Sequence, residues 1–441
     1  MTPERKYASG FALRTALALR SAPHWRSVSS ELPASLPRVE RLVTCTPEQC
    51  VCRSCGKDTV VIGYERSEQL DVKTADYIVV VTKREKRARK GCAEGVSTAP
   101  LPERIVEKGL VSDQMVINTL VSKYSDHLPL YRQIVMLERD AGVSISRATM
   151  DGWVMTVGGL LIPVVKAMGR ELTAGGYIQA DETTVGVQTH DKSGKNHQAY
   201  LWQYGKPGGS AVFDFRMGRG REGPKQFLGQ FEGILQTDGY AAYDHTGGPK
   251  MVHAACWAHA RRKVFDALKL NPDDRVARQL VERMDELFLL DAEAREAEMG
   301  HAGRHILRQA QARPLREIIR DEMKATQVAA LPASALGKVV RYTLSLWHKL
   351  RRFVEHPELE LSNNLAENSM RGITLGRKNW IHVGSEQAGP KVAAILSAIE
   401  SCRRMKLPVC DYLGSVLPGL ANRPIQRVSQ LTPAACAASR P

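Results

Sequence analysis

The chain has 441 residues, of which 43% are hydrophobic, so it is long enough to form two to four domains with buried cores. Lysine and arginine number 62 against 47 aspartates and glutamates, which gives a formal net charge of +15. This excess favours a polyanionic partner, with nucleic acid first. The alternative is a basic soluble enzyme without such a partner.

We expect no membrane span and no secretory signal. The longest relevant uncharged run, residues 152–165, has 14 residues and contains Pro163, whereas a spanning helix needs about 20 apolar residues. In the basic N-terminal segment, Arg14 and Arg20 interrupt any apolar signal core.

Nine cysteines are present, and an odd count with one tight cluster indicates a reducing compartment and a metal site rather than a disulfide framework. Cys52 and Cys55 form a CxxCG turn, which places two thiolates on one zinc ion. Cys92 is the expected third ligand, and Cys50 or Cys45 the fourth. Residues 31–100 are therefore predicted to form a zinc-finger-like element, with a strand-like run at 75–90, after an unmatched segment 1–30. The alternative is a degenerate site without metal.

Residues 101–170 are predicted to be helical. Within them, residues 130–154 favour a helix, a turn at Gly142 and a second helix capped at Ser144 or Ser146. Helix-turn-helix units read DNA in this way. The same arrangement is also common in plain helical packing, which remains the alternative.

From residue 176 to 265 the pattern changes to strands. Runs at 177–187, 198–205 and 210–220 favour three hairpin-linked strands, followed by a helix at 223–231 and a strand at 233–244. A connector, taken as helical, a further strand after Lys250 and a helix from Ala260 complete the order β-β-β-α-β-α-β-α. This order predicts an α/β fold with a mixed sheet and helices on its faces.

Residues 266–345 are predicted to be an all-helical insertion. Its first helix, from residue 272, has apolar residues at helical spacing: Val276, Leu280, Met284, Leu287 and Phe288. A basic helix follows at 338–353. The tail, 403–441, carries several prolines and is expected to be loosely ordered.

Three acidic residues are candidates for a metal site. Asp181 lies within the first strand, Asp238 ends a later strand, and Glu367 lies in a predicted helix. Two strand carboxylates and a third from a helix would supply the oxygen ligands that magnesium or manganese prefers. Ions held in this way activate the nucleophile and stabilise the leaving oxygen at phosphorus. In the alternative interpretation Asp238 forms a turn and Glu367 pairs with Arg371.

The runs YIQADETTV, LQTDGYAAYD, CWAHARRK and NNLAENSMRGITLGRKNW together resemble the transposases of the insertion sequence 66 family. The resemblance covers about nine-tenths of the chain, from about Leu32 to the tail, and the last run is its most specific part. It implies a ribonuclease-H-like catalytic domain at residues 171–265 and 346–402, interrupted by the helical insertion. It also implies a DDE-type transposase in the bacterial cytoplasm, associated with the nucleoid.

The resemblance assigns catalytic and magnesium-binding roles to Asp181, Asp238 and Glu367, with Asp181 facing the metals and Glu182 pointing away. It assigns phosphate contacts on DNA to Arg371, Arg377 and Lys378. Expected partners are the element's terminal inverted repeats, target DNA, further copies of this chain and small companion proteins. For Cys256 and His259, a recurrent CxxH pair, a second metal site and packing at a helix start both remain open.

The chain also departs from this family. Its first 30 residues match neither the family's long N-terminal helix nor its zinc element, which suggests a truncated or frame-shifted start. Arg89 occupies the first position of the expected second CxxC. The alternatives to a working transposase are a decayed or domesticated copy that only binds DNA, and a structure-specific nuclease of the same fold.

Overall fold

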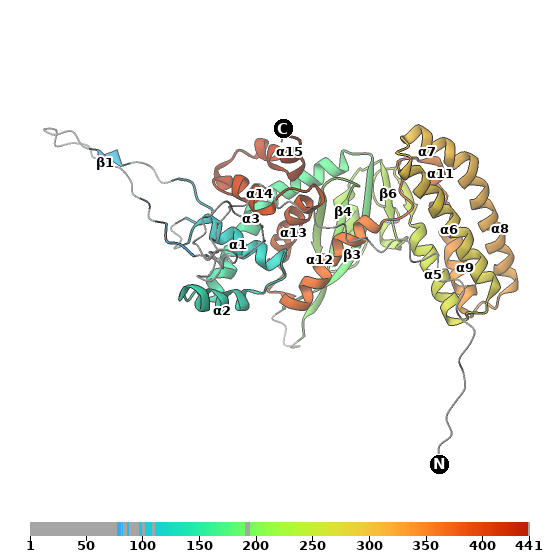
Figure 1. Cartoon of the computed structure of the whole chain (residues 1–441), viewed down its shortest axis with the longest axis horizontal. Coiled ribbons are helices and arrows are strands. Elements are labelled where there is room, and N and C mark those ends of the chain that lie inside the picture. The colour runs from blue at the N-terminus through green and yellow to red at the C-terminus, as the bar shows by residue number, and fades with distance from the viewer. Residues whose placement is uncertain are drawn as a thin grey trace, which may run out of the picture. The chain divides into compact units, whose positions relative to one another are not determined.

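The computed structural model in Figure 1 describes residues 77–80, 82, 86–87, 97–98, 102–107, 111–189 and 195–439. The chain divides into two compact units, residues 1–78 and 79–441. Almost all described residues belong to the second unit, and every described helix and strand lies within it. The predicted zinc ligands, Cys45, Cys50, Cys52, Cys55 and Cys92, lie outside the described residues.

The second unit contains strands of two separate sheets. The strands are β1 (Lys86–Arg87), β2 (Ser97–Thr98), β3 (Tyr177–Val187), β4 (His197–Gly205), β5 (Ala211–Arg216), β6 (Ile234–Thr237), β7 (Val252–Ala255) and β8 (His382–Val383). Among the described strands, β1 and β2 pair with each other. The main sheet has the order β5-β4-β3-β6-β7, and β8 pairs with the end of β3.

The described helices precede, cover and follow this sheet. Before it come α1 (Asp113–Tyr124), α2 (Leu130–Ala141) and α3 (Arg147–Thr173). Within and after it come α4 (Glu222–Leu228), η2 (Ala241–Tyr243), α5 (Trp257–Leu270), α6 (Arg275–Glu296), α7 (His301–Leu307), η3 (Arg308–Ala312), α8 (Arg313–Ala329), α9 (Ala335–Ser345), α10 (Trp347–Leu350) and α11 (Arg352–Glu355). The last are α12 (Asn364–Trp380), α13 (Gly389–Arg404), α14 (Val409–Val416), η4 (Leu420–Asn422), η5 (Ile425–Leu431) and α15 (Pro433–Ala438).

The sheet is mixed, as its sequence predicts. β3, β4 and β5 form an antiparallel meander, whereas β6 and β7 continue the sheet in parallel with β3. The strand predicted at 177–187 coincides with β3, and those at 198–205 and 210–220 correspond to β4 and a shorter β5. The α/β class with a mixed sheet is therefore confirmed.

The free edge of β5 is covered by α13. The backbone N–H of Phe213 donates to Ser397 Oγ at 2.8 Å, and that of Ala211 donates to Ser401 Oγ at 2.9 Å. The two serines lie one turn apart on the same face of the helix. Their hydroxyls therefore match two successive N–H groups on the outer edge of the strand. An uncovered edge would present these groups to other strands, and the helix removes that exposure.

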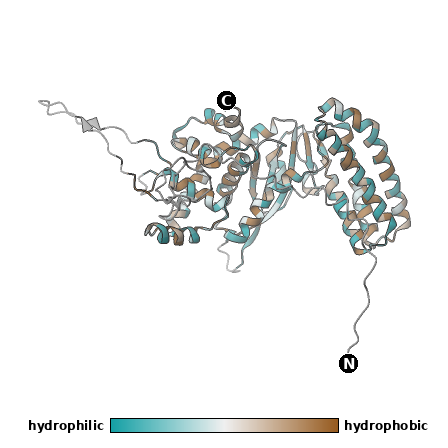
Figure 2. Cartoon of the chain, viewed as in Figure 1, coloured by the Kyte–Doolittle hydropathy of each residue, from teal (hydrophilic) through white to brown (hydrophobic). Residues whose placement is uncertain are grey.

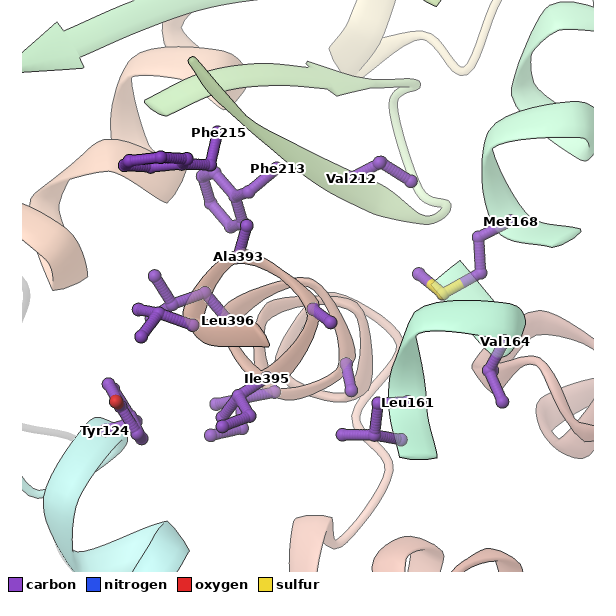
Figure 3. Close-up of a cluster of buried hydrophobic side chains, with 14 of the residues drawn as sticks. Tyr124, Leu161, Val164, Met168, Val212, Phe213, Phe215, Ala393, Ile395 and Leu396 are labelled. Atoms are coloured by element: carbon purple, nitrogen blue, oxygen red, sulfur yellow. The ribbon is translucent and has the colours of Figure 1, made fainter. Parts of the chain in front are cut away.

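One hydrophobic core joins α13 to β5, α3 and α1 (Figure 3). Ala393 and Leu396 of α13 lie near Phe213 and Phe215 of β5, and Leu161 of α3 borders the same cluster. At Gly158, α3 approaches α13 closely, because an added Cβ would lie 2.9 Å from the carbonyl oxygen of Lys391.

A second core lies within a helical bundle that includes α5, α6, α8 and α9. Hydrophobic and hydrophilic residues alternate along these helices (Figure 2), as expected for helices with one buried face. The core reaches the sheet through Ile234 of β6 and Ala254 of β7. In α6, Leu280, Met284 and Leu287 are buried as predicted. Val276 is instead exposed, because the side of the first turn that faces the core is occupied by Ala277, which is fully buried.

Helix boundaries around the predicted helix-turn-helix unit agree with the sequence. α2 ends at Gly142, whose φ of 64° is the left-handed conformation that glycine adopts readily. α3 begins after Ser146, whose hydroxyl accepts the N–H of Thr149 at 3.1 Å. Beyond its first turn, α3 is largely buried.

Several predicted elements are wrong. The strand predicted at 233–244 ends at Thr237, because Gly239 has a φ of 98° and turns the chain. In place of the helix expected before β7, the described chain forms the short 3-10 helix η2. The helix predicted at 338–353 is divided into α9, α10 and α11. Within the strand-like run, residues 77–80 have no regular structure. The described strand of this run is β1, which pairs with β2 over two residues.

The tail prediction is also wrong, because residues 403–439 are folded. Tyr412, Leu413 and Val416 share a face of α14 and are buried in the core around α13. The Tyr412 hydroxyl donates to the carbonyl oxygen of Leu431 at 2.8 Å, and Thr432 caps α15. Prolines in this segment therefore begin short helices rather than prevent folding.

The long helix α3 passes the length and hydropathy criteria for a membrane span, with 27 residues. Val157, Leu161, Val164 and Met168 are fully buried in the protein core, however. The apolar character of α3 is therefore accounted for by packing.

Removing the two α13 hydroxyls should weaken the sheet edge. In the double variant Ser397→Ala, Ser401→Ala, two buried N–H groups lose their partners, at about 1–3 kcal/mol each. We expect a lower free energy of unfolding in urea titrations. Ser415→Ala, on an exposed position of α14, is the control, and an equal effect there would contradict the role of the edge hydroxyls.

Candidate active site

The pairing of β3 with β6 places Asp181 beside Asp238. Residues in register on these parallel strands differ by 57 in number, and Gln179 lies opposite Gln236. Asp181 and Asp238 continue the same register two residues further on. Because side chains alternate along strands, both aspartates lie on the face where Gln179 Nε2 donates to Gln236 Oε1 at 3.0 Å.

Glu367 reaches this face from α12. The backbone before α12 lies over the two glutamines, since Gln236 Nε2 donates to Glu360 O at 2.7 Å and Gln179 Nε2 to Ser362 O at 3.0 Å. Glu367 lies in the first turn of α12, where the helix dipole favours a negative charge. The structure thus brings the three predicted acids to one side of the sheet.

The electrostatics of Asp181 reflect the nearness of the other acids. Burial raises the pKa of Asp181 to about 7, and the neighbouring charges of Glu182, Asp238 and Glu367 act in the same direction. The N–H of Glu182, donating to Asp181 Oδ1 at 2.9 Å, partly opposes this shift. A half-buried carboxylate near two others needs a cation to hold its charged form.

The turn after β6 fixes the second acid. Asp238 Oδ1 accepts the N–H of Tyr240 at 2.8 Å, and Thr237 Oγ1 accepts that of Gly239 at 3.0 Å. An added Cβ at Gly239 would lie 2.6 Å from a methyl carbon of Leu346, so both the positive φ and the close approach require glycine.

Glu367 has weak partners in this structure. His259 Nε2 lies 3.4 Å from its Oε1, and Arg262 Nη2 lies 3.5 Å from its Oε2. Oε1 is buried and has no hydrogen-bond partner among the described residues. The pairing of Glu367 with Arg371 considered from the sequence is thus replaced by contacts from α5.

The donor set fits a divalent cation of the magnesium class. Carboxylate oxygens are the ligands such ions prefer, and the long contact from Arg262 offsets the charge of Glu367 only in part. Within the described part of the chain, no group of three or more acidic, histidine or cysteine side chains is already gathered as a ligand set. The carboxylates would therefore adjust to hold an ion.

Glu182 has a separate set of partners. Its side chain is 4% exposed, pairs with Arg219 Nη2 at 2.7 Å and accepts the hydroxyl of Tyr243 at 2.9 Å. Burial raises the pKa of Glu182, and the bonds from Arg219 and Tyr243 counteract it. The guanidinium of Arg219 lies 4.1 Å from the ring centroid of Tyr240. Glu182 thus anchors the β5–α4 loop to the turn after Asp238.

A polar network supports the same turn from the other side. Lys349, buried in the bundle, pairs with Asp244, and His253 Nδ1 lies 3.2 Å from the same carboxylate. Hydrogen bonds from His253 and Lys349 hold the pKa of Asp244 well below its usual range. His253 Nε2 also lies 2.9 Å from Thr237 Oγ1. The network therefore joins the bundle to the segment carrying Asp238.

The CxxH residues occupy the start of α5. Cys256 is the N-terminal cap residue of α5; it is buried, and its Sγ lies 3.5 Å from the backbone nitrogen of Asn363. Burial raises the pKa of its thiol to about 11, which is typical of a packed, unreactive cysteine. Burial also lowers the pKa of His259, against the opposing charges of Glu367 and Asp238.

The predicted DNA contacts differ in their surroundings. Arg371 and Lys378 are exposed or half-exposed on α12. Arg377 is half-buried, and its Nη1 donates to Thr183 Oγ1 at 3.1 Å and Thr184 Oγ1 at 3.0 Å. Arg377 therefore holds α12 on β3.

The sequence analysis did not identify Arg262 or Lys349 as residues near the carboxylates. Arg262 lies one helical turn after His259, a spacing that indicates a shared face of α5. Lys349 offered no comparable signal, since its partner Asp244 is 105 residues away.

This fold and site are those of a nucleic-acid-processing enzyme family. The chain belongs to the transposase IS66 family, whose model matches residues 108–391. Similar proteins include the uncharacterized proteins y4qI and y4hP from Sinorhizobium fredii (strain NBRC 101917 / NGR234). The first is 32% identical over 418 residues, covering 91% of this chain and 76% of that relative. The second is 27% identical over 457 residues, covering 98% and 81%.

The raised pKa of Asp181 predicts that this residue lowers the free energy of unfolding to an extent that depends on pH. Its pKa is about 7 in the folded chain against 3.8 ordinarily. Between those values the folded state keeps a proton that the unfolded state has released, so stability falls as pH rises through this window. In chelator, Asp181→Asn should raise the free energy of unfolding at about pH 8 by on the order of 2 kcal/mol, with little gain near pH 4.

Urea titrations of Asp181→Asn at both pH values measure this gain. Asp321→Asn, on an exposed position of α8, is the control. Magnesium should stabilise the original chain more than Asp181→Asn. A gain that is equal at both pH values would show that burial of the Asp181 charge is not its cause.

Breaking the Asp244 network should destabilise the fold. Asp244→Ala leaves the buried Lys349 ammonium without its carboxylate, at a cost of about 3 kcal/mol. The double variant Asp244→Ala, Lys349→Met removes both charges and should recover part of that loss. Thermal and urea unfolding of the single and double variants test this. A double variant less stable than Asp244→Ala would contradict the pairing.

Proposed function

We propose that this protein is a metal-dependent DNA transposase that cleaves DNA at insertion-sequence ends and joins the freed 3′ hydroxyl to target DNA. The observation that supports the proposal is the register of β3 and β6, whose continuation two residues beyond Gln179 and Gln236 leads to Asp181 and Asp238. Family membership supplies the substrate class, and the net charge of +15 suits DNA.

In this proposal residues 171–265 and 346–402 form a ribonuclease-H-like catalytic domain, with 266–345 as a helical insertion. The mixed sheet and the helical composition of 275–345 support this division. α5 crosses the proposed boundary at 265, so the two parts share a helix.

Asp181, Asp238 and Glu367 would hold magnesium or manganese. When bound, such ions activate a water or a 3′ hydroxyl and stabilise the leaving oxygen at phosphorus. The chain itself orients the acids: the β3–β6 pairing fixes Asp181 and Asp238, and the first turn of α12 presents Glu367. Arg262 offsets part of the charge at Glu367, and the ring of His259 lies beside the same carboxylate.

DNA contacts are proposed for Arg371 and Lys378, with Arg377 positioning their helix. The first turn of α3, following Ser146, is exposed. It is the part of the helix-turn-helix unit able to reach base edges, since recognition helices use their N-terminal residues. Zinc binding by Cys52, Cys55, Cys92 and Cys50, self-association, companion proteins and a nucleoid-associated cytoplasmic location complete the proposal.

The test is a cleavage and joining assay on a duplex carrying the element's ends, with a target plasmid and magnesium, manganese or chelator. Asp181→Asn, Asp238→Asn and Glu367→Gln should each lower joined product by about 1,000-fold, because each removes a proposed metal ligand. DNA affinity in chelator should change by less than about two-fold, since these acids do not bind phosphate directly.

Asp321→Asn is the matched control and should retain activity. Cleavage that survives Asp181→Asn would overturn the site. Hydrolysis without joining would indicate a nuclease, and binding without cleavage at any metal would indicate a decayed copy or a missing companion protein.

A further inference from the structure

A basic pocket of about 550 Å³ opens beside the carboxylates. It lies between α5, α6 and the start of α12, and its lining includes Arg261, Arg262, Phe265, Lys269 and Asn364. Its volume lies within the range of about 300–1,000 Å³ that small-ligand sites occupy. The proposed metal ligands and DNA contacts do not include this pocket.

The pocket combines an aromatic surface with cations. The ring of Phe265 is 36% exposed. Lys269 Nζ lies 4.7 Å from its centroid and the Arg261 guanidinium 5.6 Å from it. Asp285 pairs with Arg261 and holds that side chain against the pocket wall. A flat apolar face bordered by cations is the combination that binds a stacked base and its phosphate.

Arg262 connects the pocket with the acids. Its side chain is 54% exposed, lines the pocket and reaches Glu367 Oε2 through a long contact of 3.5 Å. Asn364, three residues before Glu367, lines the same pocket. A ligand here would therefore lie next to Glu367, the acid that Arg262 contacts.

We propose that this pocket binds one nucleotide of the DNA strand held at the carboxylates, with the base on Phe265 and the adjoining phosphate on Arg262. The inference rests on the proposed function and deepens it by assigning a strand-binding subsite. Arg262 is placed to exchange its weak contact with Glu367 for the phosphate. Asp266 and Asp285 on the lining balance Lys269 and Arg261, which leaves Arg262 as the phosphate contact.

The test uses the full chain and fluorescently labelled oligothymidylate, with binding measured across a salt series. Arg262→Gln should reduce the slope of log affinity against log salt by about 0.7, the value for one lost phosphate contact on a single strand. Phe265→Ala should weaken binding by at least about five-fold and leave the slope unchanged, because it removes stacking without a charge.

Arg313→Gln is the matched control: it removes the same charge from an exposed helical position outside the pocket. A second measurement locates the base directly, by photocrosslinking an oligonucleotide that contains 5-iodouracil and mapping the attached peptide. We expect a crosslink on the peptide containing Phe265, lost in Phe265→Ala.

Equal salt slopes for Arg262→Gln and Arg313→Gln, or crosslinks confined to other peptides, would overturn the inference. The outcome is separable from the proposed function. Strand joining by the original chain with unchanged binding by the pocket variants rejects the pocket alone. Loss of binding as expected, in a chain that never joins strands, supports the pocket and counts against strand joining by this chain without companion proteins.

Discussion

The pairing of β3 with β6 is the constraint on which the carboxylate site depends. Parallel strands are about 4.8 Å apart, so a register difference of 57 residues sets Asp181 and Asp238 side by side. The hydrogen bond between Gln179 and Gln236 makes this register specific, because a slip by one residue would turn one amide to the opposite face. The same amides bind the backbone that leads into α12, so one pair of buried side chains positions elements carrying all three acids.

Placing these carboxylates close together costs electrostatic free energy. Neighbouring donors and cations reduce that cost but do not cancel it. Glu182, the fourth acid nearby, is neutralised by Arg219 and Tyr243. Glu367 has only long contacts to His259 and Arg262, and Asp181 keeps a pKa near 7. The remaining negative charge is what a cation would offset.

Local sequence patterns predicted much of this arrangement. The strand pattern of 177–187 reveals where the first strand runs, and the spacing of 57 residues between Asp181 and Asp238 is compatible with adjacent strands. The sequence did not reveal that Gly239 stops β6 early, because that turn depends on the close approach of the distant Leu346. It also did not reveal that the tail packs on α13, because that packing depends on a core shared with residues far away in the chain. Arg262 and Lys349 were missed for the same reason: their partners are more than 100 residues away.

The helical bundle is a structural part of the site rather than an appendage. It separates Asp238 from Glu367 in sequence, so it must return the chain to the sheet at a fixed point. Arg308 does this from within the bundle: its guanidinium binds Asp291 at 2.8 Å and the carbonyl oxygens of Phe353 and Leu359 at 2.9 and 2.8 Å. Leu361 O then accepts the N–H of Trp257 at 2.9 Å, where α5 begins. Because Glu367 follows six residues later, its position is set by the same contacts that hold the bundle together.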